Sequence, residues 1–284
     1  MQSKISDKEY AQRKEKNMGE RIRLCFAVCA YKNSPYLENC IQSLKRQTLQ
    51  SDIILATSTP SQYIEELAAK YELPYFVRKG KSDIQDDWNF AYRMAYRHTG
   101  ADYVTIAHQD DEYAPEYARM LVKTVSGCRN ISLFITDYLP IKHGRIGKRD
   151  INSRLRRLLR MPLKIKCLSD KKWVKKGVLR FGNSICCPSV AYNRRMLGNT
   201  VFTSQYKYDL DWDTFYKYAC RKGRFAYVDL PLTFYRVHDG ATSKEFIEDN
   251  RRVLDDTSMF EKFWPKWFAK ILMIFYKMAY KTYD

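Results

Sequence analysis

The chain has 284 residues, a length that can bury a substantial core as one large or two small domains. Apolar residues make up 45% of it and aromatic residues 14%, which excludes an intrinsically disordered protein. The formal net charge of +18 favours an acidic partner, such as nucleic acid, nucleotide phosphates or an anionic membrane surface. The sequence shows no apolar run long enough to span a bilayer, and residues 1–20 are polar and unlike a signal peptide.

The cysteines favour a reducing compartment. None of the eight forms a Cys-x-x-Cys pair, which argues against a zinc site, and we expect reduced thiols in a cytosolic protein. Cys25 and Cys29 are four residues apart on an expected strand and should share one buried face.

Strand and helix patterns alternate over the first half of the chain. Apolar runs predict buried strands at 23–30, 52–56, 103–107 and, more weakly, 75–78. Helical spacing predicts helices at 35–47, from 62 to about 71, and at about 86–98. This alternation implies an α/β fold with a mostly parallel sheet covered by helices on both faces.

The strand that begins at Tyr103 ends in three consecutive acids, Asp110, Asp111 and Glu112. Pro115 follows and suits the first turn of a helix. In an open α/β sheet, ligands bind outside the carboxyl ends of the strands, and a divalent cation relieves the repulsion between carboxylates clustered there. The alternative interpretation is a strand end with solvated acids.

Five short segments occur in an informative order and spacing. They are Val28–Leu37 with Cys40–Leu44 and Gln47-Thr48, Asp87–Ala91, His108–Asp111, Asp211–Asp213 and Tyr235–His238. Together they resemble the motifs of the family 2 glycosyltransferases of the GT-A fold, and the resemblance runs from about Arg23 to Ser243. It implies a GT-A, Rossmann-like α/β sheet, to which this chain adds a basic insertion on the acceptor side and a C-terminal amphipathic helix.

The resemblance also implies the reaction and the residues that perform it. We expect transfer of a sugar from a nucleoside-diphosphate sugar, such as a UDP-sugar, to a hydroxyl of a glycan or lipid-linked glycan. Residues expected to contact the donor are Ala30, Tyr31, Thr57, Ser58, Asp87, Asn89, Gln109, Asp111 and Arg236. A metal is expected on Asp110, with His108 and His238 as further ligands. Oxygen ligands favour Mg²⁺ or Mn²⁺, and a histidine ligand shifts the preference towards Mn²⁺.

Two positions depart from the family pattern. Thr57 and Ser58 stand where the family commonly has an Asp-Asp pair, which leaves the nucleobase open; turn and helix-cap chemistry is an equal interpretation. His108 replaces the first acid of the metal motif. It could hydrogen-bond the sugar, bind a softer divalent ion or play a structural role.

The acceptor hydroxyl is a poor nucleophile and needs a general base. Asp209, Asp211 and Asp213 all lie near the start of a predicted helix, where the helix dipole stabilises carboxylates, so helix capping is the alternative role. The resemblance selects Asp211, because it precedes Trp212 as the family's base does. Direct displacement with this base inverts the anomeric configuration, whereas retention requires a second nucleophilic carboxylate that the sequence does not identify.

Two basic segments carry apolar side chains at helical spacing. Residues 142–180 contain fifteen Lys or Arg and two acids, and Ile151, Leu155, Leu158 and Leu159 predict a basic amphipathic helix that ends near Pro162. A second apolar stripe, interleaved with lysines, runs from Phe260 to Met278. Both segments suit an anionic membrane surface, or alternatively pack on the catalytic domain or a partner chain. Under the membrane interpretation, deletion after Phe260 releases the protein from vesicles and leaves activity on soluble acceptors.

These segments define the expected organisation. We predict an extension at 1–20, a catalytic domain at 21–243 and a C-terminal helical segment at 244–284. Within the catalytic domain, 21–137 would bind the nucleotide sugar, and 138–243, with the basic loop 142–180, would bind the acceptor. We expect a cytoplasmic location at the inner face of the cell membrane, in surface polysaccharide assembly.

Two other classes compete with this interpretation. A nucleic-acid-binding protein would explain the charge of +18, but the charge is concentrated in the loop and the tail and no nucleic-acid-binding signature is present. We therefore expect no nucleic-acid partner. A non-catalytic glycan-binding relative remains the other alternative.

Overall fold

The computed structural model describes residues 22–128, 130–238 and 251–280. The extension 1–20 and the boundary expected between 243 and 244 lie outside these residues, so the division into segments stays a prediction.

The first half of the chain builds a parallel sheet. Its strands are β1 (Leu24–Ala30), β2 (Asp52–Thr57), β3 (Tyr75–Val77) and β4 (Tyr103–His108). The connecting helices are α2 (Leu37–Lys45), α3 (Gln62–Lys70) and α4 (Ile84–Thr99). The alternation expected from the sequence is confirmed, with boundaries shifted by one or two residues.

The second half extends this sheet with mixed pairing. Its strands are β5 (Glu112–Tyr113), β6 (Ile131–Lys142), β7 (Arg145–Ile146), β8 (Val190–Asn193) and β9 (Arg224–Arg236). β8 is antiparallel to both β4 and β6, whereas β6 and β9 are parallel. The strand order is β3-β2-β1-β4-β8-β6-β9-β5, with β7 paired to β6. The α/β class is confirmed, and the parallel character belongs mainly to the half that ends at β4.

Helices cover both faces of the sheet. On one face α2, α3 and α5 (Tyr117–Ser126) bury their apolar side chains against the even positions of β1, such as Phe26 and Val28. On the other face Cys25 and Cys29 face the cluster that contains α4, so these two cysteines share one face as expected. All eight cysteines are free thiols.

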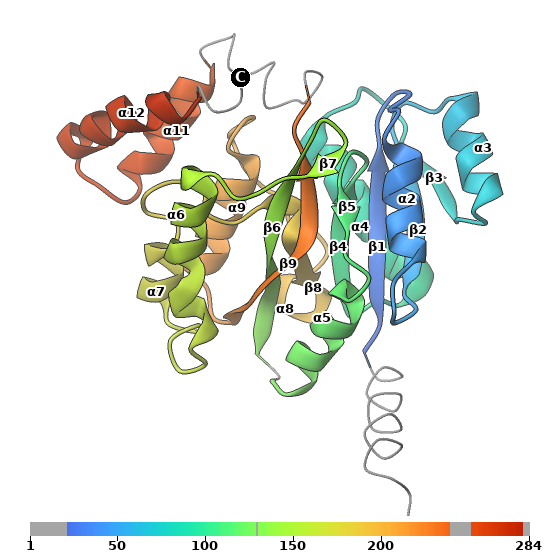
Figure 1. Cartoon of the computed structure of the whole chain (residues 1–284), viewed down its shortest axis with the longest axis horizontal. Helices are drawn as coiled ribbons and strands as arrows, with labels where there is room; N and C mark the ends of the chain where they lie inside the picture. Colours follow the sequence, from blue (N-terminus) through green and yellow to red (C-terminus); the bar gives the residue numbers. More distant parts are fainter. Residues whose placement is uncertain (1–21, 129, 239–250, 281–284) are drawn as a thin grey trace, which may run out of the picture.

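The remaining helices gather on the second face and at one end of the molecule (Figure 1). They are α6 (Ile151–Arg160), α7 (Lys172–Gly177), α8 (Arg194–Leu197), α9 (Leu210–Ala219), α11 (Arg251–Glu261) and α12 (Lys266–Tyr280). α11 and α12 lie side by side near α6 and α9. No helix in the described part of the chain is long and apolar enough to cross a bilayer.

The C-terminal helix α12 has two apolar faces with different surroundings. Ala269 and Met273 are buried in the same hydrophobic cluster as Phe260. Trp267 and Phe275, on the opposite face, are each 66% exposed. Deletion after Phe260 would therefore open the core, and the expectation that such a truncation keeps activity needs correction.

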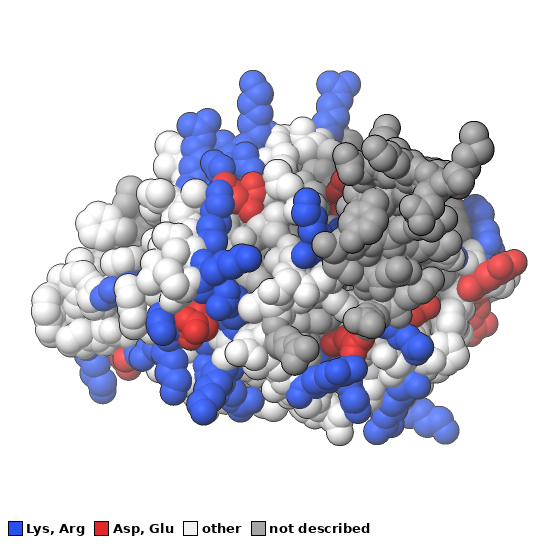
Figure 2. Space-filling model, turned by 90° about the horizontal axis from the view of Figure 1, so that it is seen from below, with Lys and Arg blue, Asp and Glu red and all other residues white. Residues whose placement is uncertain are grey.

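Basic side chains are spread over the face of the molecule that Figure 2 draws. Figure 2 shows Lys and Arg spread over one face, with few acidic side chains and a mostly uncharged left-hand end. This pattern agrees with the composition of 50 Lys and Arg against 32 Asp and Glu.

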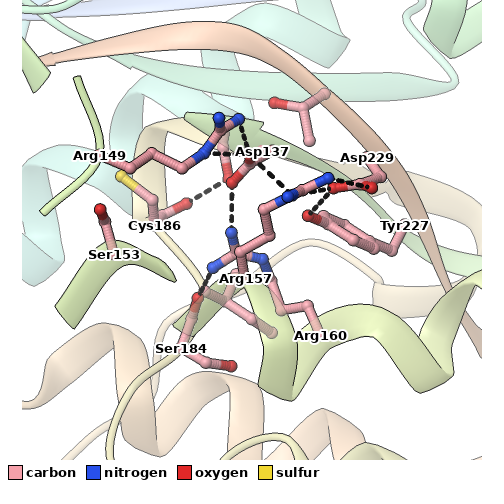
Figure 3. Close-up of polar contacts among 12 residues, drawn as sticks. Asp137, Arg149, Ser153, Arg157, Arg160, Ser184, Cys186, Tyr227 and Asp229 are labelled. Atoms are coloured by element: carbon pink, nitrogen blue, oxygen red, sulfur yellow. Dashed lines mark hydrogen bonds and ion pairs between the residues drawn. The ribbon is translucent and has the colours of Figure 1, made fainter. Parts of the chain in front are cut away.

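Helix α6 turns arginines inward and apolar side chains outward. Arg160 is fully buried and pairs with the buried Asp137 of β6, as Figure 3 shows. Arg157 donates to both carboxylate oxygens of Asp229, at 2.7 and 2.8 Å. Ile151, by contrast, is 84% exposed. The predicted amphipathic helix is present, and part of its basic face is used inside the protein.

Candidate active site

The carboxyl ends of β1, β2 and β4 meet at one edge of the sheet. In the parallel register Ala30 lies opposite Thr57, and Cys29 lies opposite His108. The acidic turn after β4 therefore opens at the edge where α/β sheets bind their ligands.

Asp110 contacts a histidine from the far end of the catalytic segment. The Nε2 atom of His238 lies 3.0 Å from Oδ2 of Asp110, and both side chains are about four-fifths buried. Burial alone would raise the pKa of Asp110, but the His238 hydrogen bond and the nearby His108 lower it below its ordinary value. Asp110 is therefore held as a carboxylate beside two imidazoles.

Asp111 is the more deeply placed of the two aspartates. It is fully buried, and its Oδ1 accepts a 2.9 Å hydrogen bond from the main-chain N–H of Arg236. Burial, followed by the charge of Asp110, raises the pKa of Asp111 well above its ordinary value. Asp111 therefore holds the main chain of Arg236 against the turn that follows β4.

Arg236 is committed to the same turn. Its guanidinium donates to the main-chain oxygen of Asp110 at 2.9 Å, pairs with Glu112 at 2.5 Å and lies 4.4 Å above the ring of Tyr36. These contacts hold β9 against the acidic turn. Its expected contact with the diphosphate stays a prediction.

His108 stacks on Trp88 of α4, with ring centroids 4.8 Å apart and an interplanar angle of 20°. Burial lowers its pKa, so the imidazole is held neutral, the form that binds metals. Ligand atoms of His108, Asp110 and Asp111 all lie within 4.8 Å of one another.

Buried polar atoms without hydrogen-bond partners indicate whether a cation would fit among His108, Asp110 and Asp111. Within the described residues, the buried Nε2 of His108 and Oδ2 of Asp111 have no hydrogen-bond partner. A neutral imidazole and two carboxylates suit Mn²⁺, and they also offer the oxygen ligands that Mg²⁺ prefers. The residues present fit a divalent cation, with Asp111 in the group in place of the expected ligand His238. His238 lies 3.0 Å from Asp110, and its role as a metal ligand stays a prediction.

Gln109 joins the ends of β4 and β1. Its side-chain oxygen accepts from the N–H of Tyr31 at 2.8 Å, and its Nε2 donates to the carbonyl of Tyr31 at 3.0 Å. The next residue, Lys32, has a φ of 53°, and its N–H donates to Thr59. Gln109 therefore shapes the loop after Ala30, while the ring of Tyr31 remains 46% exposed.

The residues expected to face the nucleobase form a small polar group. Ser58 donates to Asp87 at 2.8 Å, and Arg78 contacts the same carboxylate at 2.5 Å. Thr57 is buried, and its hydroxyl accepts from the N–H of Thr59. Turn chemistry thus uses the Thr57 hydroxyl, whereas Ser58 is hydrogen-bonded to Asp87, and the expected contacts of these residues with the donor stay predictions.

The side chain of Asn89 is hydrogen-bonded to main chain from a distant part of the sequence. It is 5% exposed, and its Nδ2 donates to the carbonyl of Phe202 at 2.7 Å. Its Oδ1 accepts from the N–H groups of Val201 and Phe202. Asn89 therefore holds this main chain, and its expected contact with the donor stays a prediction.

Asp211 carries the features expected of a base. It lies in the first turn of α9, and burial raises its pKa from 3.8 to about 6. Its Oδ2 accepts from Asn183 at 2.8 Å, and its Oδ1 accepts from the N–H of Trp212. Sequence reasoning missed Asn183, because a lone asparagine in a loop carries no pattern.

The neighbouring aspartates are placed differently. Asp213 is fully buried between Lys217 and Lys262; burial would raise its pKa, but the hydrogen bonds from these lysines lower it. Asp209 precedes α9 and is 4% exposed, and burial followed by the charge of Asp256 raises its pKa well above the ordinary value. Asp213 is neutralised by lysines and Asp209 is held in its protonated form.

Asp111 and Asp211 face a common neighbour. Burial, and then the charges of these two aspartates among others, raise the pKa of the Cys186 thiol. The acidic turn after β4 and the start of α9 therefore border the same region.

A mixed α/β sheet with helices on both faces, matching solved glycosyltransferase structures, is the GT-A fold of glycosyltransferases. The sequence profile of glycosyl transferase family 2 matches residues 25–174, and the chain belongs to this family.

Solved structures show the same fold at low sequence identity. The crystal structure of S. aureus TarS in complex with UDP-GlcNAc is 13% identical, with a TM-score of 0.57 over 85% of this chain and 71% of that chain. The mannosyltransferase PcManGT from Pyrobaculum calidifontis, in complex with GDP-Man and Mn²⁺, is 15% identical, with a TM-score of 0.56 over 93% of this chain and 74% of that chain. A comparison with curated protein sequences gave no match.

Proposed function

We propose that the protein is an inverting glycosyltransferase that moves a sugar from a nucleoside-diphosphate sugar to a hydroxyl of a glycan or lipid-linked glycan. The observation that carries the proposal is the group of His108, Asp110 and Asp111 at the carboxyl edge, with Asp211 across from it. A divalent cation bound there, Mn²⁺ or Mg²⁺, would neutralise as a Lewis acid the charge that develops on the departing diphosphate.

The protein's own groups supply the rest of the chemistry. Asp110 stays ionised through its contact with His238 and offers a carboxylate to the cation. Asp211 takes the proton of the acceptor hydroxyl, and its pKa of about 6 leaves it ionised at neutral pH while keeping it more basic than an ordinary aspartate. Single displacement by that hydroxyl inverts the anomeric centre.

The surface supports work at an anionic membrane. Trp267, Ile274 and Phe275 form an exposed apolar stripe on α12, and Ile151, with its helix α6, adds a second exposed apolar face. Each Lys or Arg near the headgroups contributes about 1 kcal/mol of attraction. We propose a peripheral location on the inner face of the cell membrane, in assembly of a surface polysaccharide.

Donor binding and transfer can be tested separately. Sugar nucleotides are scored by thermal shift with and without Mn²⁺, because a ligand that binds only the folded state raises its stability. Asp211→Asn should keep this shift and lose about 10²- to 10⁴-fold in transfer rate. Equal loss of binding and transfer would remove Asp211 as the base, and the absence of a shift with every nucleotide would overturn the proposed activity.

A further inference from the structure

The segment 178–185 runs beside the proposed base and is held by two tryptophans. The Nε1 atom of Trp212 donates to the carbonyl of Leu179 at 3.1 Å. The Nε1 atom of Trp264, between α11 and α12, donates to the carbonyl of Arg180 at 2.8 Å. The segment is therefore tied both to α9 and to the C-terminal helices.

Helix α6 holds the same segment from the other side. Arg160 donates to the carbonyl of Ser184 and pairs with Asp137, as Figure 3 shows. Asn183 thus lies between two fixed stretches of main chain.

The amide of Asn183 is oriented towards Asp211. Its Oδ1 accepts from the N–H of Ile185 at 3.2 Å, which leaves Nδ2 to donate to Oδ2 of Asp211 at 2.8 Å. A donor at this distance stabilises the ionised carboxylate and fixes its orientation.

Tyr276 of α12 packs beside Gly182 and Trp212, the residues next to Asn183 and Asp211 in the sequence. Gly182 has a φ of +121°, and a Cβ there would lie 2.7 Å from Cε2 of Tyr276, so the close approach requires glycine. The Tyr276 ring also lies 6.3 Å from the ring of Trp212, the residue after Asp211. One side chain of α12 therefore packs against the main chain before Asn183 and the ring of the residue after the proposed base.

We infer that Asn183 is a positioning residue for the Asp211 carboxylate and that Tyr276 keeps the two in contact, which makes helix α12 part of the catalytic apparatus. This inference rests on the proposed function, because it takes Asp211 as the base. It gives the C-terminal helix a role in the reaction that is separate from membrane binding.

Several titratable groups face Asp211 and bear on the test. They are Arg156 of α6, Asp209 before α9, Cys186 and Cys187, and Tyr192 of β8. Burial raises the pKa of both thiols and of the tyrosine, so these three groups stay neutral. Burial and the charge of Asp256 raise the pKa of Asp209 well above its ordinary value, and Asp209→Asn serves to separate its contribution from that of Asp211.

The test measures kcat against pH for Asn183→Ala, since the acid limb of this profile reports the base in the enzyme–substrate complex. We expect kcat to fall about 10- to 100-fold from misorientation of the base. The acid limb should move up by about one pH unit, because the ionised carboxylate loses a donor. The donor KM should stay unchanged. A folded variant with the wild-type limb would overturn the inference.

Tyr276 is tested by matched variants on one helix. Tyr276→Ala should lower kcat and move the acid limb in the same direction, whereas Tyr276→Phe, which keeps the ring, should move the limb less than Tyr276→Ala does. Phe275→Ala removes an exposed neighbour and should leave the limb in place. If Tyr276→Ala loses activity but the acid limb of its pH profile does not move, Tyr276 has only a structural role, and the inference that it keeps Asn183 and Asp211 in contact is overturned.

Two further variants keep the outcomes distinct. If Asn183→Ala does not fold, Asn183→Ser, with a shorter donor, is measured in the same way and should show the same upward shift. If Asp211→Asn retains transfer, the proposed base fails. If Asp211→Asn loses transfer while Asn183→Ala keeps the wild-type limb, only the positioning role fails.

Discussion

The Nε2 atom of His238, beyond the end of β9, lies 3.0 Å from Oδ2 of Asp110, beyond the end of β4. The two residues are 128 positions apart in the sequence. Their contact closes the acidic turn with an imidazole and holds Asp110 as a carboxylate. The last motif of the catalytic segment is thus assembled with the first acidic one.

Removal of the Asp110 carboxylate should abolish metal-dependent donor binding. With nucleotide sugar and Mn²⁺ at about 100 times the dissociation constant, the wild type should gain about 2–3 kcal/mol of stability. Asp110→Ala should show no gain from Mn²⁺, as measured by thermal unfolding. Glu116→Ala, which removes an exposed acid at the start of α5, should keep the full effect. A metal-dependent gain in Asp110→Ala would place the cation elsewhere.

The neutral variant Asp211→Asn should be more stable than the wild type at pH 7. The folded protein binds this proton more tightly than the unfolded chain, so wild-type stability falls as the pH rises from about 4 to about 6. The difference between 3.8 and about 6 corresponds to at most about 3 kcal/mol. Urea unfolding at pH 7 and pH 4 should show a gain that shrinks at the lower pH. A gain that is the same at both values would contradict the raised pKa.

Truncation of Arg160 should destabilise the protein strongly. Arg160→Ala leaves the buried Asp137 without one of its partners, and removal of one member of a buried ion pair costs about 3–5 kcal/mol. Arg154→Ala, at an exposed position of the same helix, should change stability by less than about 0.5 kcal/mol. Urea unfolding gives both values. Similar losses of unfolding free energy in the two variants would show that the buried Arg160–Asp137 pair does not stabilise the fold.

Charges on the exposed face of α12 should weaken vesicle binding. Trp267→Asp and Phe275→Asp replace side chains that are each 66% exposed, so the fold should persist. Each variant loses the burial of one large apolar side chain in the membrane, which is worth about 1.5–3 kcal/mol. Cosedimentation with anionic phosphatidylglycerol vesicles should therefore fall about tenfold or more. Val77→Asp, on the distant strand β3 with 42% exposure, is the matched control. Equal binding by all three variants and the wild type would exclude α12 as the contact.

The sequence was sufficient to predict the sheet edge that carries the site. The β1 run is apolar throughout and the β4 run is broken only by Thr105 before His108, because both faces of these strands are buried. Their ends bring Ala30 and His108 to one edge. The acids after β4 could therefore be placed at a ligand edge before any contact was known.

Other features depend on partners that lie far away in the chain. Periodicity predicted the helix α6, but its inward face is set by Asp137 and Asp229, which belong to other strands. Asn183 is 28 residues from Asp211, and no local pattern marks its contact. Asn89 matched a motif, yet its amide is occupied by main chain more than 100 residues away.

The free thiols make the protein convenient to label. Cys167, between α6 and α7, is the exposed one among the eight cysteines. Burial raises the pKa of Cys25, Cys29 and Cys40 and so suppresses their reactive thiolate form. A fluorophore attached through a maleimide should therefore react first at Cys167. Such a dye would sit on the basic insertion itself and report its approach to a bilayer without any engineered cysteine.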